Sequence, residues 1–187
     1  MVACGLQTAD PHCFGSGSLR AFEPIVMGVS AVSMKTHYCA DQTRTVFKGE
    51  PSVELKKMYD VVLKVQEHSI KMIRPGINGK EIYDWTIKYF KDAGYPTDLK
   101  KRPIEGFFHC VGHGVGIDIH ESPIIGRVKW ILEEGNIVTV EPGLYYQRAR
   151  GHIPVGGIRI EDMVFITKNG CLNLTKFPKD IKNMIIP

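Results

Sequence analysis

The sequence predicts an α+β fold in which a helical layer is followed by a sheet. Between residues 52 and 93, apolar residues recur at helical spacing. Beyond residue 104 they occur in short, strand-like runs separated by glycine and proline. The length of 187 residues fits one domain and is enough to bury a core, and a hydrophobic fraction of 43% is ordinary for a globular protein.

The first part of the chain is expected to be irregular. Residues 1–20 are rich in glycine and serine and lack periodicity, which predicts an irregular N-terminal arm before a single domain over residues 21–187. Apolar residues between positions 23 and 47 then indicate two short strands.

Two helices are expected next. Ser52 is suited to the N-cap of a first helix, which Arg74-Pro75-Gly76 ends. The second helix should run from about Lys80 to Ala93, with Gly94 as its C-terminal cap.

Charge and composition argue against nucleic acid and membrane as partners. The net charge is only +4, and the densest basic run, Lys100-Lys101-Arg102, is typical of a solvated turn. No apolar stretch approaches the ~20 residues of a membrane span, and the N-terminus lacks the pattern of a secretory signal. The five cysteines are odd in number, widely spaced and without a CxxC pair, which favours free thiols and a cytoplasmic location.

The most informative segment is the run from Gly112 to Pro123, which reads GHGVGIDIHESP. It places His113 and His120 seven residues apart, an odd spacing that would put them on opposite faces of one continuous strand, so a loop or bulge must redirect one of them. Further candidates are carboxylates on or beside strand-like runs: Asp41, Glu141 and Glu161. An imidazole with several carboxylates is a ligand set expected for Mn, Co, Fe or Zn in a hydrolase.

Read together, these segments resemble the creatinase/methionine aminopeptidase metallopeptidase family, and most closely its Xaa-Pro branch of prolidase and aminopeptidase P. The likeness runs from about Phe22 to the C-terminus and includes the ending LTKFPKD at residues 174–180. It implies the pita-bread fold, a curved, mostly antiparallel sheet covered by helices on its outer face. The family's catalytic domain is longer and begins with extra helices, and the branch has a separate N-terminal domain, so a short version with an incomplete N-terminal part is expected.

The resemblance also implies a role for each candidate residue. Glu141 is expected to bind metal, Glu141 or Glu161 to take a proton from the attacking water, and His120 to hydrogen-bond the substrate carbonyl and the developing oxyanion. Arg159 and His109 are expected on the substrate side, with Arg159 close enough to Glu161 for an ion pair. The implied metal ligands are Asp41, His113, Glu141 and Glu161. His12 and His68 are interpreted as incidental.

One family ligand has no counterpart. The resemblance calls for two aspartates, usually eleven residues apart, and Asp41 matches the second. Counting back eleven gives Ser30; a longer hairpin gives Val26; a third alignment deletes the strand and makes His37 the match of a family histidine. Each alternative loses a charged ligand, so one ion is expected where the family binds two.

The leading functional hypothesis is a metallopeptidase that uses a metal-activated water to remove an N-terminal residue before proline. Its cofactor would be Mn or Co, with Zn or Fe as alternatives, as one or two ions. Its partner would be a short peptide substrate, with a homodimer left open. Methionine aminopeptidase and creatinase-like C–N hydrolysis are alternatives of the same fold. A catalytically impaired pita-bread protein that serves as a binding module is the alternative from another class.

Overall fold

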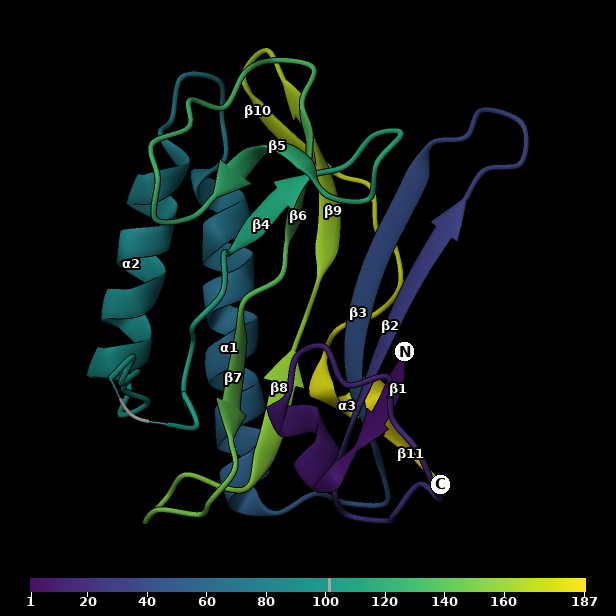
Figure 1. Cartoon of the computed structure of the whole chain (residues 1–187), viewed down its shortest axis with the longest axis vertical. Helices are drawn as coiled ribbons and strands as arrows, with labels where there is room; N and C mark the ends of the chain where they lie inside the picture. The colour runs from purple at the N-terminus through teal and green to yellow at the C-terminus, as the bar shows by residue number, and fades with distance from the viewer. Residues whose placement is uncertain (101) are drawn as a thin grey trace.

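The computed structural model describes residues 1–100 and 102–187; Lys101, in the basic run expected to form a solvated turn, lies outside the described residues. Figure 1 shows two long helices beside a set of sheets and a long hairpin that projects from the rest. The helical elements are η1 (Gly5–Ala9), α1 (Val53–Met72), α2 (Gly79–Asp92) and α3 (Ile181–Met184). The strands are β1 (Val2–Cys4), β2 (Pro24–Val32), β3 (Cys39–Lys48), β4 (Gly112–Gly114), β5 (Glu121–Ile125), β6 (Ile137–Val140), β7 (Gly143–Tyr146), β8 (Gly156–Arg159), β9 (Asp162–Thr167), β10 (Gly170–Asn173) and β11 (Ile185–Ile186).

The strands form three adjoining sheets. The first has the order β1-β2-β3-β11, the second β10-β9-β6-β4-β5, and β7 pairs with β8. Every pairing is antiparallel except that of β11 with β3, so the mostly antiparallel character is as expected. An isolated bridge between Thr43 and Glu161 ties the first sheet to the segment that joins β8 to β9.

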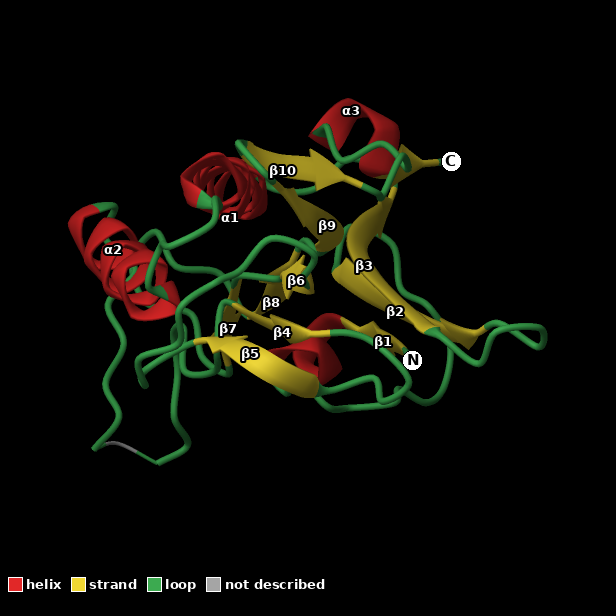
Figure 2. Cartoon of the chain, turned by 90° about the horizontal axis from the view of Figure 1, so that it is seen from above, coloured by secondary structure: helices red, strands yellow, loops and turns green. Residues whose placement is uncertain are grey.

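Helices α1 and α2 cover the outer side of the five-stranded sheet (Figure 2). Both were predicted to within a few residues. Ser52 caps α1, its side chain accepting a hydrogen bond from the backbone N–H of Leu55, and Asn78 caps α2 in the same way through Lys80. The buried stripe of α1, which includes Met58, packs with the apolar sides of the strands into one core.

The N-terminal segment differs from the expectation. The prediction of an irregular arm is wrong for residues 2–9, because β1 pairs with β2 and η1 packs beside β8. Ala3 and Cys4 are buried, and Thr8 Oγ1 accepts a hydrogen bond of 2.6 Å from the backbone N–H of Gly157. A strand of three residues shows no periodicity in the sequence, which is why the pattern was missed. Residues 10–20 contain no helix or strand, and a domain boundary at residue 21 stays a prediction.

All five cysteines are free thiols, as the spacing indicated. None of the helices in the described ranges combines the length and the apolarity that crossing a membrane requires.

Candidate metal centre

A cleft of about 560 Å³ lies between the first sheet and the five-stranded sheet. Alternate residues of β3 point into it because side chains alternate along a strand, so Asp41 and Thr43 share the cleft face. The other candidates reach it from distant parts of the chain. The lining residues are Met1, Pro11, His12, Phe14, Gly28, Ser30, Asp41, Thr43, His109, Cys110, His113, His120, Ile124, Glu141, Arg159 and Glu161.

His113 enters the cleft from the short strand β4, where glycine on both sides is required. A Cβ on Gly112 would lie 1.8 Å from the backbone oxygen of Thr139, and one on Gly114 would lie 2.4 Å from that of Ser122. The glycines therefore allow β4 to pack tightly between β6 and β5. The close neighbours are strand backbones rather than a ligand.

The ring nitrogens of His113 have different partners. Nδ1 lies 3.0 Å from the backbone oxygen of Gly114, which can only accept, so Nδ1 carries a proton. Nε2 lies 3.1 Å from Glu141 Oε1. Burial lowers the pKa of His113, but the hydrogen bond and charge of Glu141 outweigh it and raise that pKa to about 9. Without an ion, Nε2 therefore donates to Glu141.

Glu141 follows directly after β6, where its side chain is held by its neighbours. Its backbone N–H donates to Val111, and the Thr139 hydroxyl donates to Oε1 at 3.4 Å. Burial alone would raise the pKa of Glu141, but the hydrogen bond from His113 and nearby positive charges lower it. The carboxylate thus remains ionised where it lines the cleft.

Glu161 has the most unusual environment in the cleft. Only 2% of the surface of Glu161 is exposed, and its Oε2 accepts a 2.6 Å hydrogen bond from the Thr43 hydroxyl. Oε1 is buried without any hydrogen-bond partner in the described part of the chain. Burial, together with the charges of Glu141 and Asp41, raises the pKa of Glu161 to about 8. A buried carboxylate oxygen without a partner is costly, so this atom is suited to a cation.

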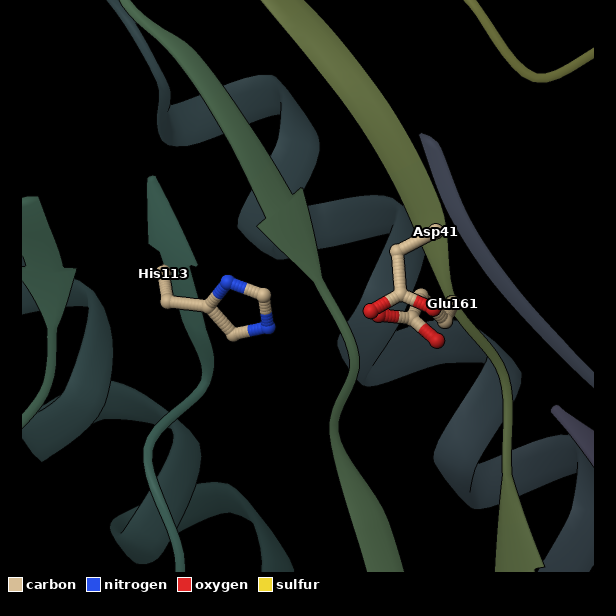
Figure 3. Close-up of side chains that lie close together, drawn as sticks. All are labelled: Asp41, His113 and Glu161. Atoms are coloured by element: carbon tan, nitrogen blue, oxygen red, sulfur yellow. The ribbon is translucent and has the colours of Figure 1, made fainter. Parts of the chain in front are cut away.

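Three candidates converge on one point. Figure 3 shows the imidazole of His113 directed toward the carboxylates of Asp41 and Glu161, which lie together. One donor atom from each of the three residues lies within 4.8 Å of the others. Glu141 is outside this group but contacts His113. Burial raises the pKa of Asp41, even though Ser30 donates a hydrogen bond to it.

The opposite face of β3 anchors the segment that carries Glu161. Arg44 donates from Nη1 to the backbone oxygens of Thr43 and Glu161, and from Nη2 to Asp162 Oδ1 at 2.7 Å. Asp162 Oδ2 also pairs with Lys179 Nζ at 2.8 Å. This buried ion network fixes the backbone positions from which Thr43 and Glu161 extend into the cleft.

His120 lies beside His113 despite the odd spacing. The pairing of β4 with β5 shifts register after His113, and the chain loops between the strands, which returns His120 to the same side. The two ring centroids are 4.3 Å apart and the rings meet edge to face. His120 is exposed at the cleft, so it faces solvent where His113 is enclosed.

His109 and Arg159 both line the cleft, but the expected ion pair between Arg159 and Glu161 is not formed. Arg159 Nε donates to the Thr43 hydroxyl at 3.3 Å, and that hydroxyl donates to Glu161, so Thr43 links the two.

His109 is fixed between the backbone oxygen of Cys110 at 2.7 Å and the Tyr145 hydroxyl at 2.9 Å. Burial lowers the pKa of His109, which favours a neutral ring.

Comparison with known proteins agrees with this geometry. The model of metallopeptidase family M24 matches residues 1–168. The chain belongs to this family. An M24 relative, the Xaa-Pro dipeptidase of Pyrococcus furiosus, is 33% identical over 97% of this chain and 48% of its own length.

Solved structures show the same fold. The Xaa-Pro dipeptidase from Bacillus anthracis superposes with a TM-score of 0.86 at 35% identity, over 100% of this chain and 48% of that one. The prolidase from Pyrococcus horikoshii superposes with a TM-score of 0.85 at 33% identity, over 97% and 48% of the two chains. The pita-bread fold is therefore confirmed. The chain spans about half the length of the curated relatives it matches.

An M24 metallopeptidase implies a divalent metal, and the residues present fit one. The unpartnered Glu161 Oε1, the nearby Asp41 carboxylate and the imidazole of His113 supply anionic and neutral donors of the types such ions bind.

The β2–β3 register shows where each residue from the three alternative alignments lies. Ser30 faces Asp41 directly in the β2–β3 register and lines the cleft. Val26 is buried opposite Thr45, and His37 lies in the hairpin turn, outside the cleft lining. Strand β2 is therefore present opposite β3, and Ser30 is the residue that lies across from Asp41.

The sequence interpretation missed the contribution of the N-terminal segment to the cleft. His12, interpreted as incidental, lines the cleft together with Phe14, and the neighbouring Pro11 accepts a 2.9 Å hydrogen bond from Arg159 Nη1. No periodicity marks this segment; the proximity of His12 to His109 becomes visible only in the fold.

Proposed function

We propose that this M24 chain is a metal-dependent, peptidase-like hydrolase that holds one divalent ion between Asp41, His113 and Glu161, with Glu141 as a fourth ligand. The observation that carries the proposal is Glu161 Oε1, a buried carboxylate oxygen without a partner, within reach of two further donors. A folded protein retains such an atom at a cost unless a ligand satisfies it.

The donor set suits Mn or Co best, with Zn or Fe as alternatives, because it mixes carboxylate oxygens with one imidazole. One ion is proposed rather than two because Ser30 occupies the position that would supply another carboxylate. The carboxylates of Asp41, Glu141 and Glu161 together offset the charge of one divalent cation. They would neutralise the charge of two divalent cations only in part.

The side chains around the ion would divide the chemistry of peptide hydrolysis. A bound divalent ion would supply a Lewis acid that polarises a carbonyl and lowers the pKa of water. Glu141, ionised beside His113, is placed to accept the proton that the attacking water loses. His120, exposed at the cleft, is placed to donate a hydrogen bond to the developing oxyanion.

The proposed substrate is a short peptide with proline in second position. The support is that relatives matching 97% of this chain are named Xaa-Pro dipeptidases. Arg159 and His109 offer a cation and a neutral imidazole on the cleft wall, which suit the carboxylate and carbonyl groups of a peptide. A cytoplasmic location and a homodimer belong to the same proposal.

Calorimetric titration with Mn²⁺ and Co²⁺, followed by hydrolysis assays on Ala-Pro and Ala-Ala, tests the proposal. Binding of one ion with turnover of Ala-Pro above Ala-Ala supports it. Absence of ion binding contradicts the metal centre, and equal turnover of the two dipeptides contradicts the proline specificity.

A binding module that has lost catalysis is the second candidate. Ser30 in place of a carboxylate favours it, since a weaker metal centre would slow hydrolysis. An ion that binds tightly while Xaa-Pro peptides bind without being cleaved would select this candidate over the enzyme.

A further inference from the structure

A second pocket of about 280 Å³, the Trp130 pocket, adjoins the metal cleft. It lies where β5 and the loop after it approach α2. Its apolar wall is made by five side chains from α2, β5 and the neighbouring loops: Tyr83, Phe108, Ile124, Val128 and Trp130. Three residues line both the Trp130 pocket and the metal cleft, so the two cavities share a wall: His109, Cys110 and Ile124.

Ile124 shows on which side of the sheet the Trp130 pocket opens. It pairs with His113 in the β4–β5 register, and directly paired residues of two strands point to the same face of their sheet. His113 extends into the metal cleft, so Ile124 lies on the cleft side as well. A peptide held at the metal centre can therefore continue past Ile124 into the Trp130 pocket without crossing a strand.

Gly126 keeps the passage between the two cavities open. A Cβ at this position would lie 3.1 Å from Ile124 Cγ2 and 3.4 Å from Cys110 Cβ. Ile124 and Cys110 belong to the wall that the cavities share, so a side chain at residue 126 would fill space beside that wall. The end of the loop is held in place, because the backbone oxygen of Trp130 accepts a 2.8 Å hydrogen bond from the N–H of Gly79.

Arg127 adds one positive charge to this apolar surface. Its Nε donates to the Tyr83 hydroxyl at 2.8 Å, and its Nη2 donates to the backbone oxygen of Phe108 at 3.4 Å. Both partners are neutral, so they orient the guanidinium without offsetting its charge. Among the described residues that line the Trp130 pocket, none is an aspartate or a glutamate. The pocket therefore suits a ligand that combines an apolar group with a carboxylate.

We propose that the Trp130 pocket binds the third residue of a peptide substrate, taking up an apolar side chain while Arg127 pairs with the α-carboxylate that follows it. The proposal rests on the Xaa-Pro peptidase function proposed above, in which the first two residues of the peptide lie at the metal centre. A volume of about 280 Å³ suits one residue rather than a whole peptide, since pockets for small ligands begin at roughly 300 Å³.

Charge decides which end of the peptide enters the Trp130 pocket. The N-terminal ammonium group needs a carboxylate partner, and the carboxylates of Asp41, Glu141 and Glu161 all line the metal cleft. The Trp130 pocket offers the guanidinium of Arg127 instead, which pairs with a carboxylate. The N-terminal end of the peptide therefore lies in the cleft and its C-terminal end in the pocket. The preferred substrates are Xaa-Pro tripeptides with an apolar last residue.

The fluorescence of Trp130 tests the proposal. The chain has two tryptophans, and the other, Trp85, stacks on His68 outside the lining of both cavities. A Trp85→Phe background therefore makes the emission specific to the Trp130 pocket. This variant is titrated with Ala-Pro-Leu, Ala-Pro-Gly and the C-terminal amide of Ala-Pro-Leu, first in EDTA, where metal-dependent hydrolysis is prevented, and then by stopped flow with Mn²⁺.

Ala-Pro-Leu should change the emission of Trp130 and bind roughly tenfold more tightly than Ala-Pro-Gly, because its leucine side chain is buried in the pocket. The amide should bind about two- to fivefold more weakly than the free acid, the range for loss of an exposed ion pair. With Mn²⁺ bound, kcat/KM should show the same order of the three peptides.

Two variants separate the apolar contact from the charge. Gly126→Val should fill the space beside the shared wall and bring the affinities for Ala-Pro-Leu and Ala-Pro-Gly close together; Gly126→Ala is the milder form if the valine variant does not fold. Arg127→Gln should keep the preference for leucine but remove the difference between acid and amide. Arg74→Gln is the matched control, because Arg74 is also exposed but lies outside both cavities, and it should keep both differences.

Equal affinities for the leucine and glycine tripeptides, or a Trp130 emission that does not respond to Ala-Pro-Leu with or without Mn²⁺, would overturn the proposal. So would equal effects of Arg127→Gln and Arg74→Gln. The outcome for the proposed function is separate. A leucine preference in a protein that fails to hydrolyse Ala-Pro supports the pocket and contradicts the enzyme, whereas hydrolysis of Ala-Pro without a leucine preference contradicts the pocket alone.

Discussion

Ser30 and Asp41 face each other across the β2–β3 hairpin, and the Ser30 hydroxyl donates a hydrogen bond of 3.1 Å to Asp41 Oδ1. One oxygen of the candidate ligand is thereby engaged by a neutral group, at the position where another carboxylate would add a negative charge. The number of ions that the cleft can hold should therefore depend on residue 30.

Ser30→Asp should raise the metal stoichiometry from one ion toward two and increase hydrolysis of an Xaa-Pro dipeptide. The added carboxylate offsets the repulsion between two dications. Metal content can be measured by atomic emission after dialysis. Ala40→Asp, which adds the same charge on the other face of the hairpin, should leave the stoichiometry at one; two ions already present in wild type would contradict the reasoning.

His113→Ala should remove most metal binding, because it deletes the imidazole that converges with Asp41 and Glu161. Wild type at an ion concentration 100 times the Kd should gain about 2.7 kcal/mol of unfolding free energy, and the variant should gain little. Thermal unfolding with and without Mn²⁺ measures this. His68→Ala, which alters an exposed histidine stacked on Trp85, should respond to the ion as wild type does.

His120→Ala should leave metal affinity nearly unchanged and lower kcat about 10²–10³-fold, the usual effect of losing one oxyanion donor. Steady-state kinetics on Ala-Pro alongside calorimetry separates the two effects. Loss of the ion together with activity would mean that His120 is a ligand and that the assigned role is wrong.

Asp162→Asn should lower the free energy of unfolding by about 3–5 kcal/mol, because Arg44 and Lys179 lose a buried counter-charge. Urea unfolding followed by circular dichroism measures the loss. Combining Asp162→Asn with Arg44→Met should recover part of it, since the unpaired guanidinium is removed. If the single variant is as stable as wild type, the network does not hold the backbone beside Glu161.

The sequence predicted well the features that are local. Ser52 and the apolar stripe after it set the start and the buried face of α1. The partners of Arg159 could not be predicted in this way. Strand alternation puts it on one face with Glu161, but β8 ends at Arg159, β9 begins at Asp162, and Thr43 from a distant strand lies between the two side chains.

Features built from very short elements escaped prediction for a related reason. The strand β1 and the cleft position of His12 depend on contacts with β2 and β8 across the sequence. Periodicity carries no information on such contacts. Ser30, by contrast, was one of three candidates in the sequence for the position of the missing aspartate, and the observed register places Ser30, rather than Val26, opposite Asp41.

Because side chains alternate between the two faces of β3, an inserted residue would disturb the cleft if it lay within the strand but not if it lay in the hairpin turn. The side chains of Asp41 and Thr43 line the cleft, whereas Arg44 points to the opposite face and bonds to Asp162 in the ion network. Inserting a single residue between the hairpin turn and the Thr43–Glu161 bridge would turn Asp41 away from the cleft. Insertions in the exposed turn at residues 33–38 leave this parity untouched, so we expect length variation among natural variants to concentrate there.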